Sequence, residues 1–265
     1  MNPGKIRESV LLVAAIVLTL SGLILGLILS GGGCKSDDTT TAPPVVTPIH
    51  DDLFPLAADR RFEYTGFLVY PNTVDSAITS SVGSYLGIWT VLPGPSGTWL
   101  IRDSTTVEGI TSVRFFQIKK DSASGDLSFR QTLGPFYRAI GATYSDTLAW
   151  IELAKPSVGV GAQWSAFDTT VVGHMGGLTG DVRLQIFGKI EGQVSITDSS
   201  AAHVVYPHAY RIRTWRKIIA GGFVVQDDAT TAKLWLVADV GPVQVNISGD
   251  TENYGLFRVL TSRNF

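Results

Sequence analysis

The sequence predicts an all-β fold: a single antiparallel domain, arranged as a curved sheet, a half-barrel or a sandwich, after an N-terminal signal or membrane helix. Apolar and polar residues alternate with a period of two along much of residues 53–265, which is typical of half-buried strands. Clusters of Gly, Pro, Ser and Asp separate these segments and predict turns. No segment of this part has a helical period longer than three turns, so we expect almost no helix.

The clearest strand covers residues 182–196. Its apolar residues fall on one face, namely Val182, Leu184, Ile186, Ile190, Val194 and Ile196. The opposite face is polar except for Phe187. Gly188 and Gly192 fall on the apolar face, where glycine favours a bend or a bulge of the strand.

Ten further segments have the composition of strands: 61–70, 84–92, 98–103, 112–120, 127–133, 163–172, 210–219, 233–238, 243–248 and 255–261. Residues 145–153 are the best candidate for a short helix. No second linker interrupts this part of the chain, so we predict one β domain over residues 53–265.

The N-terminal region predicts an anchor. Lys5 and Arg7 precede 20 uncharged residues, 10–29, which as a helix could cross about 30 Å of hydrocarbon. The positive-inside rule then places everything after this segment outside the cytoplasm. Residues 1–33 are therefore either a cleaved lipoprotein signal peptide or an uncleaved membrane anchor. Residues 34–52 are predicted to be a disordered tether, because they are short, polar and rich in Thr and Pro.

Residues 29–34, Leu-Ser-Gly-Gly-Gly-Cys, resemble the cleavage region of bacterial lipoprotein signals. The resemblance implies cleavage before Cys34, the single cysteine of the chain, and acylation of its thiol by a fatty acid such as palmitate. Gly31 stands where that family has a Leu-like residue. Either interpretation predicts a protein of the cell envelope, anchored to a membrane with its domain outside the cytoplasm. In a Gram-negative cell this means the outer membrane or the periplasmic face.

Two segments of the domain resemble uncharacterised secreted bacterial β-domains. Residues 53–64 contain the Phe-Pro-Leu opening and the aromatic pair Phe62 and Tyr64, with Asp59 in place of the usual glycine. Residues 234–245 resemble the closing hairpin of those domains. The resemblance implies a curved antiparallel sheet, loosely of the lipoprotein-carrier type, and no assigned activity.

Several classes of activity lack their sequence signals. The chain has 21 Lys and Arg against 23 Asp and Glu, so we expect no nucleic-acid partner. His203 and His208 form the one close histidine pair, but their odd spacing points them to opposite faces of a strand, so we expect no metal site. The serine-hydrolase elbow, the phosphate-binding loop and the zinc-protease motif are also missing. We therefore predict a protein that is not an enzyme and uses no cofactor.

One strand face is a candidate binding surface. Arg211, Arg213, Trp215 and Lys217 alternate with less polar residues, and such a basic row with an aromatic side chain could meet anionic lipid head groups or an acidic glycan. The alternative interpretation is a solvated outer face. Similarly, the six tryptophans either line a ligand site or belong to the core.

Two functional hypotheses remain open at this point. In the first, the domain binds a hydrophobic or amphiphilic, lipid-like ligand on the concave side of its sheet. In the second, the domain is a filled structural module of the cell envelope that binds another protein. An envelope hydrolase with carboxylates converging from distant strands is a third, less favoured alternative.

Overall fold

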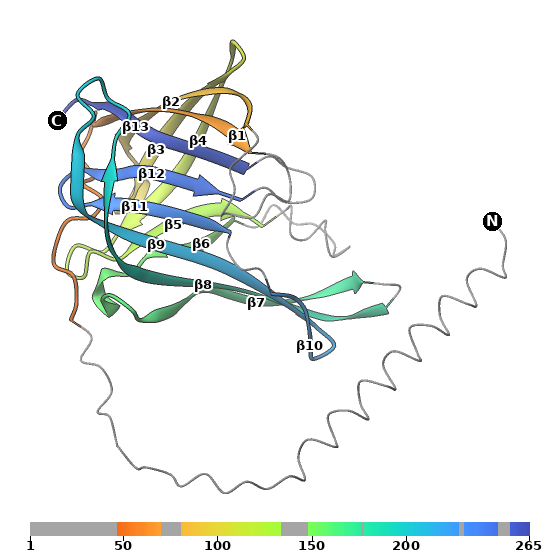
Figure 1. The fold of residues 1–265 in the computed structure, drawn as a ribbon. Helices are drawn as coiled ribbons and strands as arrows, with labels where there is room; N and C mark the ends of the chain where they lie inside the picture. Colours follow the sequence, from red (N-terminus) through yellow and green to blue (C-terminus); the bar gives the residue numbers. More distant parts are fainter. Residues whose placement is uncertain (1–46, 70–80, 134–147, 176–177, 228–230, 249–254) are drawn as a thin grey trace, which may run out of the picture. The chain divides into compact units, whose positions relative to one another are not determined.

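The computed structural model describes residues 47–69, 81–133, 148–175, 178–227, 231–248 and 255–265 (Figure 1). Residues 45–265 form one compact unit. The predicted signal or anchor (residues 1–33), Cys34 and most of the predicted tether lie outside the described residues. Among the described residues there is no helix of sufficient length and hydrophobicity to cross a membrane.

The unit is all-β, as predicted. Its strands are β1 (Arg61–Val69), β2 (Ser81–Pro93), β3 (Trp99–Val107), β4 (Ile110–Lys120), β5 (Leu127–Thr132), β6 (Leu148–Ala154), β7 (Gln163–Met175), β8 (Leu178–Thr197), β9 (Val205–Ala220), β10 (Phe223–Asp227), β11 (Ala232–Val237), β12 (Gly241–Ile247) and β13 (Gly255–Arg263). Two short 3-10 helices, η1 (Pro95–Gly97) and η2 (Pro156–Val158), lie in connections. Each of the eleven predicted strands corresponds to a strand of the sheet.

All strands belong to one antiparallel sheet in the order β6-β5-β4-β3-β2-β1-β13-β12-β11-β9-β8-β7, with β10 paired to β9. The sheet curls until its two ends meet, because β6 also contacts β7 and β8. The result is a nearly closed barrel (Figure 1). Within the described residues, β6 and β7 form no ladder, and we call this place the seam.

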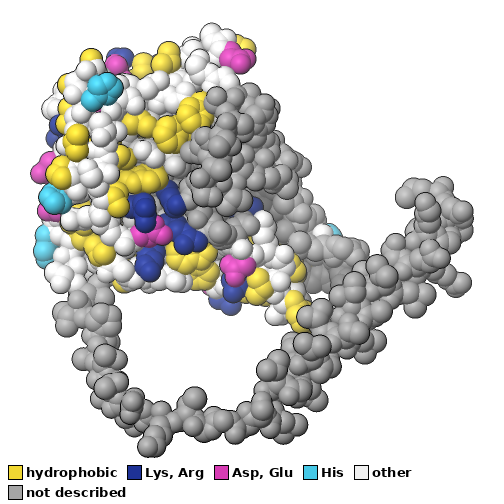
Figure 2. All heavy atoms as spheres, viewed as in Figure 1, with side chains coloured by type: hydrophobic (Ala, Val, Ile, Leu, Met, Phe, Trp, Pro, Cys, Tyr) yellow, Lys and Arg dark blue, Asp and Glu magenta, His cyan; other side chains and the backbone are white. Residues whose placement is uncertain are grey.

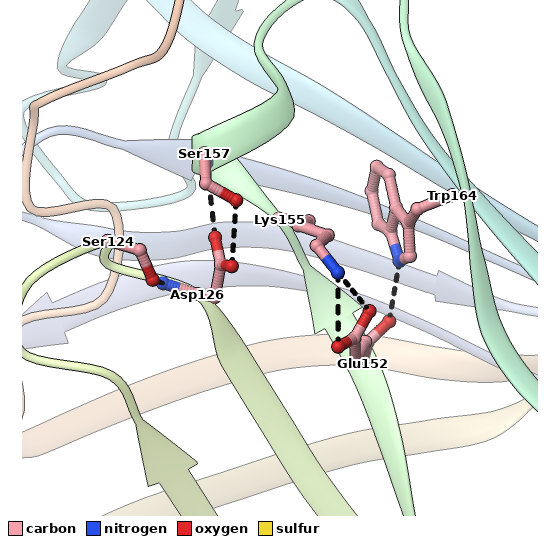
Figure 3. Close-up of polar contacts among 6 residues, drawn as sticks. All are labelled: Ser124, Asp126, Glu152, Lys155, Ser157 and Trp164. Carbon is pink, nitrogen blue, oxygen red and sulfur yellow. Dashed lines mark hydrogen bonds and ion pairs between the residues drawn. The ribbon is translucent and has the colours of Figure 1, made fainter.

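One side chain connects the two sides of the seam, and further polar contacts lie beside it (Figure 3). The indole Nε1 of Trp164 on β7 donates a hydrogen bond to the backbone oxygen of Glu152 on β6, at 3.1 Å. At the end of β6, Lys155 forms an ion pair with the Glu152 carboxylate at 2.9 Å. Asp126 accepts hydrogen bonds from the backbone nitrogen and the hydroxyl of Ser157 in η2, and so attaches the β4–β5 turn to the β6–β7 connection.

The prediction of a helix over residues 145–153 is wrong. Its described part belongs to β6, where Ile151 and Ala154 are buried. The local composition allows a helical turn, but pairing with β5 over six positions overrides that preference. The strand β10 has no predicted counterpart because three of its five residues are exposed hydrophobics, Phe223, Val224 and Val225, and give no alternation.

The two glycines of β8 have different roles in the structure. The pairing of β8 with β9 shifts register between Ile190 and Gly192, and Gly192 has a φ of 153°, so the expected bulge is at this glycine. Gly188 lies directly opposite Trp164 in the pairing with β7. A Cβ atom at Gly188 would lie 2.2 Å from the Trp164 ring, so this glycine provides the space that the ring occupies.

One end of the barrel is closed by the segment of residues 47–56, which precedes β1. Ile49, Leu53 and Phe54 are buried in the core. The carboxylate of Asp52 pairs with Lys120 at the end of β4, and the backbone oxygen of Asp52 accepts a hydrogen bond from the Asp239 nitrogen. We call this end the closed end and the opposite one, which contains the β3–β4 and β9–β10 turns, the far end.

Candidate functional site

The interior of the barrel is packed with aromatic rings near the closed end. Phe62, Tyr64 and Trp89 are almost completely buried there. Phe54, from the N-terminal segment, has its ring centroid 6.0 Å from that of Phe62 and 6.4 Å from that of Trp89. This half of the barrel is a filled core, and two of the six tryptophans, Trp89 and Trp164, belong to it.

The core has two parts rather than one. The large cluster occupies the closed end and extends along the walls. A smaller cluster of buried residues lies toward the far end beside the seam and consists of Leu133, Val182, Leu184 and Ile218. On the wall formed by β1, β3 and β13, the inward residues at this level are only half-buried, namely Leu68, Val107 and Leu256. The inner surface near the far end is therefore apolar, and these three side chains pack against the large cluster while remaining partly exposed.

Arg258 lies on the inner face of β13, between these two levels. It pairs with Gly66 on β1 and is only 2% exposed. Its guanidinium carbon lies 3.8 Å from the centroid of the Trp89 ring and 4.7 Å from that of Tyr64. One guanidinium nitrogen donates a hydrogen bond to the Tyr85 hydroxyl at 3.2 Å. The Nε atom of Arg258 and the Nε1 atom of Trp89 are both buried and have no hydrogen-bond partner among the described residues.

Hydroxyl groups connect this arginine indirectly to a carboxylate. The Tyr85 hydroxyl lies 3.3 Å from the Thr105 hydroxyl, which donates to the Asp103 carboxylate at 3.1 Å. If each hydroxyl donates toward Asp103, the Tyr85 oxygen presents a lone pair to the guanidinium. Burial raises the pKa of Tyr64, and the nearby positive charge of Arg258 opposes this rise. The interior therefore holds a cation among aromatic rings and hydroxyl groups, and the Asp103 carboxylate is close enough to contribute to the raised pKa of Tyr64.

The predicted basic row lies on the outer face of the barrel. Arg211 and Arg213 form ion pairs with the Glu191 carboxylate at 2.7 and 3.8 Å, and Lys217 pairs with Asp227 at 3.7 Å. The Trp215 ring stacks on Phe187 of β8, with centroids 5.7 Å apart. The structure thus brings the four predicted residues together on one surface, which supplies its own acidic partners.

Neighbouring strands extend this surface. Lys189 on β8 and Lys233 on β11 lie opposite Arg213 in register, so basic residues cross three strands. Figure 2 shows Lys and Arg side chains gathered around acidic atoms on this face, with hydrophobic side chains beside them. We call Lys189, Arg211, Arg213, Trp215, Lys217 and Lys233 the basic face.

A pocket of about 480 Å³ lies at the rim of the closed end. Its lining comes from the N-terminal segment, β8, β9 and the end of β11 and consists of Asp51, Gln193, Tyr206, Pro207, His208, Tyr210, Val237 and Ala238. The Tyr210 hydroxyl donates to the Asp51 carboxylate at 3.2 Å, and burial together with this carboxylate raises the pKa of Tyr210. The pocket is open to solvent and contains both apolar and acidic groups.

The histidines are dispersed. His203 lies in the β8–β9 turn with a φ of 47°, His208 lines the rim pocket, and the Nδ1 atom of His174 lies 2.6 Å from the Thr179 hydroxyl. Among the residues that the structure describes, no group of three or more His, Cys, Asp or Glu side chains is arranged to hold a metal ion.

The comparisons with known proteins identify no family. No family model matches the chain, and no curated protein matches it. A solved Bacteroides fragilis structure, described as an exported protein with a YmcC-like fold, is 10% identical, with a TM-score of 0.43 over 80% of this chain and 98% of that one. A Parabacteroides distasonis structure, described as a lipoprotein, is 8% identical, with a TM-score of 0.43 over 81% and 99%. Similarity at this level carries no conclusion about activity.

Sequence reasoning did not find Arg258 or the rim pocket. A signal for the arginine is present: Leu256, Arg258 and Leu260 follow one another at a period of two along β13, which places a cation on the same face as two leucines. The rim pocket has no such signal because Asp51, Tyr210 and Val237 come from separate parts of the chain.

Proposed function

We propose that this protein is a membrane-tethered binding protein of the cell envelope, which holds a hydrophobic or amphiphilic ligand inside its barrel without chemical turnover. The observation that supports this proposal best is the divided core. A filled aromatic core closes one end, whereas half-buried Leu68, Val107 and Leu256 line the wall near the other. Half-buried apolar surface gains stability when a ligand covers it, by about 25 cal/mol per Å².

The tethering part of the proposal depends on residues 1–34. We expect Cys34 to carry a lipid and to hold the domain at the envelope membrane. Cells that express the full chain are grown with a palmitate analogue that can be conjugated to a dye. Label on the protein that disappears in Cys34→Ser supports lipidation, whereas equal label in both forms contradicts it. A full-length mass in the mature protein would instead support the uncleaved anchor.

The binding part is tested on the domain Val45–Phe265, purified gently from the exported compartment. Native mass spectrometry should detect an adduct of lipid-like mass that is lost on extraction with organic solvent. The stripped domain should then bind the neutral dye Nile red in its native state. A bare polypeptide mass together with no uptake of Nile red would contradict the proposal.

Matched variants locate the dye. Leu68→Glu adds a charge to the inner wall, while Leu86→Glu adds the same charge to the outer face of β2, where Leu86 is 58% exposed. We expect the first variant to reduce Nile red binding at least tenfold and the second to leave it unchanged. Equal binding by both variants would place the dye outside the barrel, with the rim pocket as the next candidate.

A second candidate function is binding of an acidic protein through the basic face. The observation that favours it is the in-register row Lys189, Arg213 and Lys233, which places basic side chains on three neighbouring strands of the outer face. Cross-linking in intact cells should then capture the same partner with the wild type and lose it with Arg211→Glu. Unchanged capture with that variant would remove this candidate.

A further inference from the structure

We infer that the ligand of this barrel is an amphiphile with an anionic oxygen head group, held by the guanidinium of Arg258 and the indole nitrogen of Trp89. The inference rests on the proposed function and adds the chemistry of the ligand. Its starting point is the burial of Arg258, which is 2% exposed. A guanidinium in this position loses its hydration, and proteins normally compensate this loss with a paired anion.

The described residues do not provide that anion in direct contact. No ion pair joins Arg258 to a carboxylate in the part of the chain that the structure describes. Its hydrogen bond to protein goes to the neutral Tyr85 hydroxyl. The Asp103 carboxylate is reached only through Tyr85 and Thr105. This relay holds the guanidinium in place and leaves its Nε donor for another acceptor.

A second buried donor lies beside the first. Trp89 is 7% exposed, its Nε1 atom has no acceptor, and its ring lies 3.8 Å from the guanidinium carbon. Two unpaired buried N–H groups on adjacent side chains are unusual, because the great majority of buried donors are satisfied. An oxyanion that accepts from both groups would satisfy the two donors and neutralise the charge. Water would satisfy the donors, but the charge would then be stabilised only by the faces of Trp89 and Tyr64 and by the distant Asp103 carboxylate.

The surroundings set the direction of the ligand. The aromatic core blocks the closed end below Arg258, whereas the half-buried residues Leu68 and Leu256 lie one inward position further toward the far end. A head group at Arg258 therefore directs its hydrocarbon chain along these leucines toward the far end. A carboxylate and a phosphate monoester share the chemistry that Arg258 recognises, since both offer oxygens to a guanidinium.

The test compares head groups on one hydrocarbon chain. The domain Val45–Phe265, loaded with Nile red, is titrated with decanoate, decyl phosphate, decanol and decyltrimethylammonium below their micelle concentrations. We expect at least one of the two anions to displace the dye with a Kd about tenfold lower than that of decanol, the size of effect given by a hydrogen-bonded charge. The cation should bind most weakly. The comparison between decanoate and decyl phosphate distinguishes the two classes of head group.

Two variants assign the preference to Arg258. Arg258→Met should bring the anions and decanol to within about twofold of one another, because replacing a buried charge by an apolar residue removes the head-group site and generally preserves folding. Arg183→Met, which removes an exposed arginine paired with Asp168, should keep the tenfold preference. Trp89→Phe should keep the ring and lose part of the preference.

The outcomes separate this inference from the proposed function. If Nile red binds and all four amphiphiles displace it equally, the inference is overturned while the proposed function stands. A preference for anions that survives in Arg258→Met would also overturn it. If the domain binds neither dye nor amphiphile, the proposed function itself fails. If Arg258→Met does not fold, the wild-type series still separates the first of these results from the last, and Trp89→Phe tests the assignment to this site.

Discussion

Trp164 on β7 and Glu152 on β6 hold the barrel closed at its seam. The Trp164 Nε1 atom donates to the Glu152 backbone oxygen at 3.1 Å, at a place where the described strands share no ladder (Figure 3). The Trp164 ring is 5% exposed and covers Gly188 on the neighbouring strand β8. One side chain therefore satisfies a backbone carbonyl on one side of the seam and fills a gap in the wall on the other.

Replacing Trp164 by Phe should destabilise the domain by about 1–2 kcal/mol, because an aromatic ring is kept but the part-buried backbone oxygen of Glu152 loses its donor. Urea unfolding of Val45–Phe265 measures the change. Trp150→Phe is the matched control, since Trp150 is half-buried on β6 and stacks with Lys119. We expect a change below about 0.5 kcal/mol for the control. Equal losses in the two variants would contradict the role of the hydrogen bond.

Gly188→Ala should cost about 1–3 kcal/mol, because its methyl group would collide with the Trp164 ring at 2.2 Å and force the ring from its place. Gly180→Ala on the same strand is the control, since no atom lies within 4 Å of a Cβ at that position. Thermal unfolding and near-ultraviolet circular dichroism report the two effects. A control variant as unstable as Gly188→Ala would show that strand flexibility, not the ring, is responsible.

Asp198 organises the β8–β9 turn. Its carboxylate accepts hydrogen bonds from the Ser200 nitrogen and hydroxyl, the Val204 nitrogen and the Tyr206 hydroxyl. Burial opposes the charge of this group, but the hydrogen bonds prevail and lower the pKa of Asp198 below its ordinary value.

The lowered pKa predicts a pH dependence. A group with a depressed folded-state pKa stabilises the fold above its unfolded pKa, about 3.9 for Asp, and this contribution is lost as the pH falls through the folded-state pKa. Asp198→Asn should therefore cost about 1–3 kcal/mol at pH 7 and flatten the acid limb of the stability curve. Urea titrations from pH 7 to 2 measure this, with the exposed Asp181→Asn as control. An unchanged acid limb in Asp198→Asn would contradict the prediction.

Phe54→Ala should destabilise the domain by about 3–5 kcal/mol, because Phe54 is 2% exposed between Phe62 and Trp89 and its removal leaves a cavity in the aromatic core. Val160→Ala, at a position that is 43% exposed, should change stability by less than about 0.5 kcal/mol. Chemical unfolding distinguishes the two. A small effect of Phe54→Ala would mean that residues 47–56 cover the barrel without stabilising it.

The strands could be predicted well because their signal is local. Along β8, alternation from Val182 to Ile196 directly reflects the inner and outer faces of the wall. Prediction failed at β6, where a short segment is recruited by pairing with β5, and at β10, which is exposed. Pairing partners are set by contacts across the chain, which residue spacing does not record.

The candidate sites also differ in how far they could be predicted from the sequence. The row Arg211, Arg213, Trp215 and Lys217 could be read from the sequence because its members lie on one strand. Its acidic partner Glu191 could not, since it comes from β8. Arg258 lies on β13, whereas Trp89 and Tyr85 lie on β2. Both strands pair with β1 in the sheet, but Arg258 and Tyr85 are 173 residues apart in the sequence.

By itself the sequence determined the fold class, the positions of eleven strands and an irregularity at one of the two glycines of β8, because periodicity and backbone freedom are properties of neighbouring residues. It also supports the prediction of an anchored envelope protein through residues 1–34. Only the tertiary structure decided that the sheet curls into a barrel, that Trp164 closes it and that Arg258 lies within it. These features depend on which strands meet, and that choice is made by the burial of side chains that are distant in the chain.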